Sequence, residues 1–122
     1  MKPILNAYDP AREYFFDEGC FINELVNSPE DSAASVARAR VEPGQTTRWH
    51  RLRDITERYV VMSGTGNVEV GDLAPQPVGP GDCLVIPPMC RQRITNTGAE
   101  DLIFLAVCTP RFQAALYEDL EA

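Results

Sequence analysis

The sequence predicts one all-β domain with the architecture of a sandwich or a small barrel. Three observations support this fold class. Seven or eight short strand-like segments recur about every 8–12 residues, turn-forming residues separate them, and only the last dozen residues have helical periodicity. The chain of 122 residues has the length of a single domain, and a domain of this size needs no disulfide or metal to stabilise its core.

The first 70 residues contain four segments with the character of strands. Residues Cys20–Val26 are mostly apolar, and Ser35–Val41 alternates between two faces. Residues 57–62 are β-branched and aromatic, and they end in a glycine-rich turn at 63–66. Because the short strand at 67–70 follows this turn directly, the last two segments are expected to pair as a hairpin.

Proline and glycine are concentrated in the second half of the chain. Eleven of the 18 proline and glycine residues fall between positions 64 and 98, which favours short strands and tight turns over helices. Three more strands are expected in this half, at Cys83–Ile86, 92–95 and 102–108, with a turn at 96–98.

The last dozen residues are expected to form a short helix. Phe112, Leu116 and Leu120 recur every four positions with acidic side chains beside them, which is the pattern of an amphipathic helix. The single domain, 1–122, then has three parts: an N-terminal arm at 1–18, a barrel at 19–110 and a C-terminal helix at 111–122.

The charge balance argues against nucleic-acid binding. The chain has 11 lysine and arginine residues against 18 aspartate and glutamate residues, a net charge of −7, whereas a protein that binds a phosphate backbone needs a basic face. The longest apolar run, residues 102–108, is much shorter than a membrane-spanning helix. Since the N-terminus also has no apolar signal-peptide core, we expect a cytoplasmic protein without nucleic-acid or membrane partners.

The counts of cysteine and histidine limit the kinds of metal site. Cys20, Cys83, Cys90 and Cys108 lack the paired spacing of a structural zinc site, so they are expected to be reduced, small apolar side chains. His50 is the single histidine. Any site that needs several histidines is therefore excluded.

A frame of glycine, proline and polar residues surrounds this histidine. Its members are Gly44, His50, Glu57, Gly64, Gly81, Pro87 and Asn96. The frame resembles the two sequence motifs of the cupin family, in which three histidines and a glutamate bind a metal. The chain departs from the motifs where Leu52 and Gln92 replace the second and third histidines and Met89 replaces a glycine. The segment 108–112 is similar to the ending of small single-domain bacterial cupins.

The resemblance implies a double-stranded β-helix, the jelly-roll barrel of cupins, in which the motif side chains point into the barrel mouth. Strand alternation agrees with this fold, because residues two positions apart share one face of a strand. The expected pocket has seven residues: His50, Leu52, Glu57, Tyr59, Cys90, Gln92 and Ile94.

The metal ligands of the family are only partly present. Cupins bind iron, manganese, zinc, nickel or copper, and the resemblance carries over only His50 and Glu57 as strong ligands. Gln92 offers a neutral amide oxygen, so these three residues form the candidate site for one divalent transition metal. The alternative is a metal-free pocket in which the three side chains hydrogen-bond to one another and to water.

The resemblance also implies a protein that binds a small polar metabolite inside the barrel. Isomerase, lyase or dioxygenase chemistry would use His50, Glu57 and Tyr59 as candidate catalytic residues. The alternative is a non-catalytic module that binds a small molecule or has a structural role. Small cupins commonly pair their barrels, so a homodimer is expected.

Overall fold

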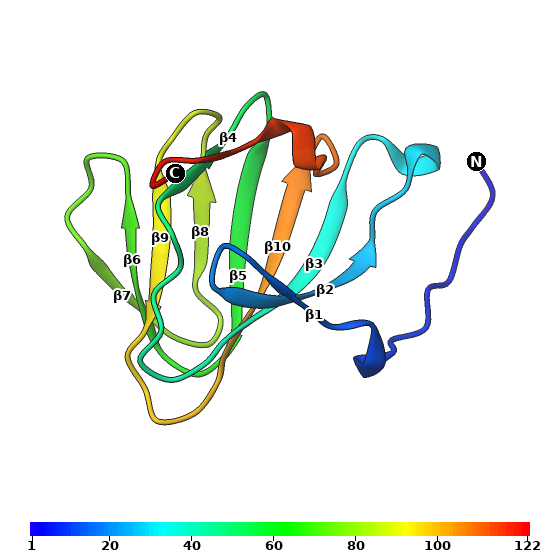
Figure 1. Ribbon diagram of the computed structural model, residues 1–122. Helices are drawn as coiled ribbons and strands as arrows, with labels where there is room; N and C mark the ends of the chain where they lie inside the picture. Colours follow the sequence, from blue (N-terminus) through cyan, green and yellow to red (C-terminus); the bar gives the residue numbers. More distant parts are fainter.

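Two antiparallel β-sheets face one another and form the body of the molecule (Figure 1). The computed structural model describes residues 1–122. The first sheet has six strands in the order β1-β2-β3-β10-β5-β8, and the second has five strands in the order β11-β4-β9-β6-β7. This arrangement confirms the all-β prediction. No helix in the chain has the length and apolar character needed to cross a membrane.

The strands are short, and single-turn 3-10 helices are the only helical elements. The strands are β1 (Tyr14–Phe16), β2 (Cys20–Val26), β3 (Ser35–Val41), β4 (His50–Leu52), β5 (Thr56–Ser63), β6 (Gly66–Val70), β7 (Gln76–Val78), β8 (Cys83–Ile86), β9 (Gln92–Asn96), β10 (Leu102–Thr109) and β11 (Tyr117–Asp119). The 3-10 helices are η1 (Pro10–Arg12), η2 (Pro29–Asp31) and η3 (Ala114–Leu116). All seven strands expected from the sequence are therefore present.

The expected hairpin between residues 57–62 and 67–70 is wrong. Strand β5 lies in the first sheet, where it pairs with β10 and β8, whereas β6 lies in the second sheet between β7 and β9. The turn between them carries the chain from one sheet to the other. Gly64 makes this turn with φ of +83°, and a Cβ atom there would lie 2.6 Å from the carbonyl oxygen of Asp101, so only glycine fits.

The expected C-terminal helix is also wrong. The segment forms the single turn η3 and then strand β11, which pairs with the edge strand β4. A helix of three turns would be marginal on its own, whereas β11 gains backbone hydrogen bonds and ion pairs. Arg48 bonds Asp119 at 3.0 Å and Arg51 bonds Glu118 at 2.7 Å.

The hydrophobic core fills the space between the two sheets. Its fully buried members include Val41, Ile86, Ile94, Leu102 and Phe104. These side chains come from alternate positions of the strands, as a sandwich of two sheets requires. Several buried polar groups, among them His50, Glu57 and Gln92, lie together where β4 meets the core, and the site lies there.

The motif asparagine has a structural role. The Nδ2 atom of Asn96 donates to the carbonyl oxygens of Val41 and Glu100, each at 2.8 Å, and its Oδ1 accepts from the backbone N–H of Gly98 at 2.9 Å. Asn96 is buried. Its side chain therefore fixes the turn that leads from β9 in the second sheet to β10 in the first.

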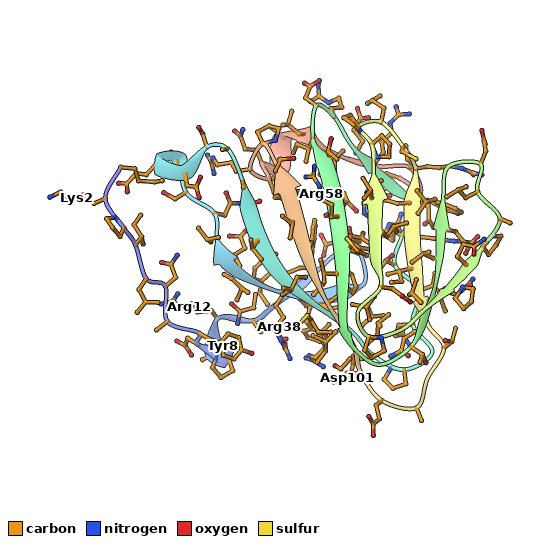
Figure 2. The ribbon with its side chains drawn as sticks, turned by 180° about the vertical axis from the view of Figure 1, so that it is seen from behind. Lys2, Tyr8, Arg12, Arg38, Arg58 and Asp101 are labelled. Atoms are coloured by element: carbon orange, nitrogen blue, oxygen red, sulfur yellow. The ribbon has the colours of Figure 1, made fainter.

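The N-terminal arm extends away from the barrel. Figure 2 shows Lys2 near its far end and Tyr8 beside Arg38, whose guanidinium lies 5.9 Å from the centroid of the tyrosine ring. The sheet begins before the expected end of the arm, since Tyr14–Phe16 already pairs with β2. Glu13 anchors the junction through a 2.6 Å ion pair with Arg40.

Candidate functional site

A cavity opens on the inner face of the six-stranded sheet and reaches His50 on β4. Apolar side chains make up most of its lining, and the aromatic rings of Phe16 and Tyr117 belong to it. The charged groups of the lining are Glu18, Glu24, His50 and Glu57. The C-terminal segment lies along β4 at this end of the barrel (Figure 1).

His50 is fixed by contacts on both ring nitrogens. Its Nδ1 lies 2.7 Å from the carbonyl oxygen of Arg48, and its Nε2 lies 3.0 Å from Oε1 of Glu18. Because a carbonyl oxygen can only accept, Nδ1 carries a hydrogen. The ring also stacks on Tyr117, with centroids 5.2 Å apart and an interplanar angle of 20°. These contacts orient Nε2 toward Glu18.

The surroundings of His50 favour its protonated form. Burial alone would lower its pKa, but the charge and hydrogen bond of Glu18 and the bond to the Arg48 carbonyl oppose burial. The charge of Glu57 acts in the same direction, and together these groups raise the pKa to about 9. At neutral pH His50 and Glu18 therefore form a buried ion pair.

Glu57 is a buried carboxyl group with one unpartnered oxygen. Its Oε2 accepts a weak bond from the Cys108 thiol at 3.7 Å, while its Oε1 has no hydrogen-bond partner in the protein. Burial and the charge of Glu18 raise its pKa to about 7, in spite of the opposing charge of His50. A buried oxygen without a partner needs water or a ligand group, and Glu57 lies in the cavity wall where either can bind it.

The side chains of Tyr59 and Gln92 are hydrogen-bond partners. The Tyr59 hydroxyl donates a short hydrogen bond to Oε1 of Gln92, and both side chains are buried. Tyr59 lines the cavity, and its ring packs against Phe104 with centroids 4.4 Å apart. The amide oxygen of Gln92, the atom expected to serve as a ligand, is thus already occupied.

The other residues expected in the pocket lie in different places. Leu52 lines the cavity and packs in a small apolar cluster with Ile55 and Cys108. Ile94 is part of the main core, behind the cavity wall. The expectation that Cys90 lines the pocket is corrected. Strand β9 begins only at Gln92, and Cys90 lies before it with its sulfur near Gly71. The structure therefore brings together His50, Glu57, Tyr59 and Leu52 but not Cys90.

Sequence reasoning missed Glu18, the direct partner of His50. Glu18 lies in the turn between β1 and β2, where Gly19 has φ of +105°. Its backbone carbonyl accepts from the N–H of Arg48 at 2.8 Å, which ties this turn to the start of β4. Its other carboxylate oxygen accepts from the Cys20 thiol at 3.2 Å. An acidic residue before a turn glycine was the sole signal, and that pattern is common on surfaces.

The donor set does not fit the metal that the cupin motifs imply. Leu52 places hydrocarbon at one ligand position, and Gln92 is engaged by Tyr59. Nε2 of His50, the atom that a metal would need, is engaged by Glu18. No group of three or more histidine, cysteine, aspartate and glutamate side chains has the arrangement of a metal site. These residues suit hydrogen bonding and proton transfer better than metal coordination.

The fold and the motif positions define a cupin. The family model for the cupin domain matches residues 37–108, and the chain belongs to this family. It is 35% identical to glucose-6-phosphate isomerase of Pyrococcus abyssi over 87% of this chain and 69% of that protein.

Solved structures show the same fold at lower identity. The nucleoside dehydratase Pac13 of Streptomyces superimposes with a TM-score of 0.76 and 20% identity, over 93% of this chain and 89% of Pac13. A Klebsiella pneumoniae protein with a double-stranded β-helix domain gives a TM-score of 0.73 and 18% identity, over 89% of this chain and 90% of that one. The expected double-stranded β-helix is thereby confirmed.

Proposed function

We propose that this cupin is an enzyme that moves protons on a small polar ligand and does so without a resident metal. The observation that carries the proposal is the 3.0 Å contact between Nε2 of His50 and Oε1 of Glu18 at the wall of the cavity. A buried, oriented pair of this kind is typical of acid–base sites. Glu57 adds a second carboxyl group with a free oxygen.

The roles follow from the chemistry of the groups. A carboxyl group with a pKa of about 7 exists in both forms at neutral pH, so Glu57 can take a proton in one step and return it in another. Protonated His50 places a positive charge at the cavity wall, which stabilises an oxygen on which negative charge develops, while its two N–H groups stay bonded to Glu18 and to the Arg48 carbonyl. The hydrogen bond from the Tyr59 hydroxyl to Gln92 fixes the position of the Tyr59 side chain in the cavity wall.

These groups suit a reaction in which a carbon-bound hydrogen next to a carbonyl group is removed as a proton. Returning the proton to a neighbouring carbon gives isomerisation, and expelling a hydroxyl group gives loss of water. Each reaction needs one base and one acid. Glu57 supplies the base, and the His50–Glu18 pair, with the proton between Nε2 and Oε1 at the cavity wall, supplies the acid. The relatives support this class, since one is named an isomerase and another a dehydratase with structures holding uridine. Dioxygenase chemistry is not favoured, because Leu52 and Gln92 remove two donors of a redox metal site.

Proton exchange tests the proposal directly. Metal-stripped protein is incubated in D₂O with neutral aldoses and ketoses, and loss of carbon-bound hydrogen is followed by NMR. We expect exchange with the wild-type protein, its loss in Glu57→Gln and His50→Gln, and no change in Glu69→Gln, a control on the outer face. A ligand that raises the melting temperature but undergoes no exchange would instead assign a non-catalytic binding role.

We also propose that the protein is a homodimer. Apolar side chains in register cover the outer face of the six-stranded sheet: Val60, Val85, Ile103, Leu105 and Val107. Arg38 and Arg40 border this patch and pair with Glu13 and Asp101. Arg58 lies between Val85 and Val107 and donates to Thr109 and to the Thr56 carbonyl. Because most of the patch is apolar, a second copy of the same face is the partner that we propose for it. Light scattering should give twice the mass of the chain, and Leu105→Glu should give a monomer; a monomeric wild-type protein would contradict the proposal.

A further inference from the structure

The cavity contains acceptors and almost no positive charge. Three of its four charged lining residues are carboxylic acids, Glu18, Glu24 and Glu57, and the fourth, His50, is paired with Glu18. None of the 11 lysine and arginine residues of the chain lines the cavity. Because His50 and Glu18 compensate one another, the uncompensated charge of the lining comes from Glu24 and from Glu57 when it is ionised, and it is negative.

The arginines of the segments that border the cavity are already bonded. Arg48 pairs with Asp119 at 3.0 Å, and Arg51 pairs with Glu118 at 2.7 Å. Arg111 donates to Oδ1 of Asn27 at 2.9 Å, and Asn27 rather than Arg111 belongs to the lining. No guanidinium is thus placed to receive an anion.

Burial and the neighbouring carboxylates both raise the pKa values of the tyrosine hydroxyl groups in the lining. Burial and the charges of Glu24 and Glu18 raise the pKa of Tyr14. Burial and the charge of Glu18 raise the pKa of Tyr117, and burial and Glu57 raise that of Tyr59. The ionised, negatively charged form of each of these three tyrosines is therefore disfavoured inside the cavity.

From this charge distribution we infer that the ligand carries hydroxyl or N–H donors and no anionic group. The inference rests on the cavity being the ligand site proposed above, and it names the ligand class. Ionised carboxylates only accept hydrogen bonds, so a sugar or a nucleoside offers the matching donors. A phosphate group brings a charge of about −1.5 to −2 and usually needs arginine, lysine or a helix N-terminus. The cavity lacks all three, although one relative is named for a phosphorylated sugar.

The charge selectivity can be measured without knowing the ligand. Ala37 lines the cavity and lies opposite Glu24 in the register of β2 and β3, so Ala37→Cys places a thiol inside. The native Cys83 is exposed and serves as a control in the same molecule. Both thiols are treated with a cationic aminoethyl and an anionic sulfonatoethyl methanethiosulfonate, and the labelling rates are read by peptide mass spectrometry.

We expect the ratio of cationic to anionic labelling rates to be at least about tenfold higher at position 37 than at Cys83. Adding Glu24→Lys should reduce this excess. An equal or lower ratio at position 37 would overturn the inference, as would a phosphorylated ligand that binds more tightly than its unphosphorylated parent. If Ala37→Cys does not fold, Ala106→Cys offers a second position in the lining. The ratio does not depend on turnover, so its failure is distinct from a failure of the proton-exchange experiment.

Discussion

Nε2 of His50 lies 3.0 Å from Oε1 of Glu18, and this contact engages the atom with which His50 would bind the metal that the cupin motif implies. The two residues come from different sheets: His50 opens β4, and Glu18 lies in the turn before β2. The 2.8 Å bond between the N–H of Arg48 and the carbonyl of Glu18 holds the two segments together. The pair therefore depends on the tertiary fold and underlies the acid–base role that we propose for this position.

Replacing Glu18 should return the pKa of His50 toward that of an unperturbed histidine. In Glu18→Gln the pKa of His50 should fall from about 9 toward 6.5, because the largest favourable charge is lost. An NMR titration measures this directly, since the chain has one histidine. Glu69→Gln, which alters a carboxylate paired with Arg93 on the outer face, should leave the titration unchanged. An unaltered pKa in Glu18→Gln would refute the ion pair.

Stability should decline as the pH rises from about 4.5 to about 9. The folded pKa values of Glu57, about 7, and of His50, about 9, both lie above their ordinary values of 4.5 and 6.5. A raised pKa means that the folded state holds the proton more tightly, so its contribution is complete below the ordinary pKa and is lost as the pH rises through the folded pKa. For Glu57 the difference corresponds to about 3 kcal/mol, lost between about pH 4.5 and 7.

Glu57→Gln should separate the contribution of Glu57 to the pH dependence of stability from that of His50. The variant cannot lose a proton at this position, so its free energy of unfolding should be flat between about pH 5 and 7 and should fall only where His50 titrates. Urea denaturation at a series of pH values measures both curves. Parallel curves for the wild-type and variant proteins would show that Glu57 is ionised in the same way in the folded and unfolded states.

Restoring the missing histidines should create metal binding. In the double variant Leu52→His/Gln92→His, two imidazoles join His50 and Glu57, which completes the three-histidine, one-glutamate set of the family. We expect elemental analysis to find about one transition metal per chain in the variant and far less in the wild-type protein. Stoichiometric metal in wild-type protein purified without chelators would contradict our account of the donor set.

Tyr117 should matter more for its ring than for its hydroxyl group. The ring stacks on His50 and lies 5.2 Å from the ring of Phe16, so it links β11 to the site. Tyr117→Ala should lower the free energy of unfolding by about 2 kcal/mol. Tyr117→Phe retains the ring and should stay within about 0.5 kcal/mol of the wild-type protein. Thermal and urea denaturation distinguish these outcomes, and equal losses in the two variants would refute the stacking role.

The sequence predicted the strands and the inward side of the motif residues because alternation repeats locally along each strand. His50 and Leu52 share one face, as do Glu57 and Tyr59, and all four are buried. Alternation does not reveal which strand pairs with which, so the turn at Gly64 was interpreted as a hairpin although it joins two sheets. Pairing is decided by contacts between strands that are distant in the sequence.

The contacts of the site were harder to predict than its location. Gln92 points inward as expected, but only the folded chain brings the Tyr59 hydroxyl to its amide oxygen. Glu18 reaches His50 through a turn tied to β4 by one backbone hydrogen bond, and no spacing in the sequence encodes that bond. The C-terminal segment had a helical apolar period, yet Arg48 and Arg51 bind it as a strand. In each case a tertiary contact determined the outcome over a local pattern.

Proton exchange with and without metal tests the central claim most directly. Wild-type protein is stripped with a chelator, one portion is reloaded with a divalent transition metal, and both portions are incubated in D₂O with the same neutral aldoses and ketoses. Our account predicts carbon-bound hydrogen exchange at the same rate in both portions and its loss in Glu57→Gln. Exchange that appears only after the metal is returned would contradict the account.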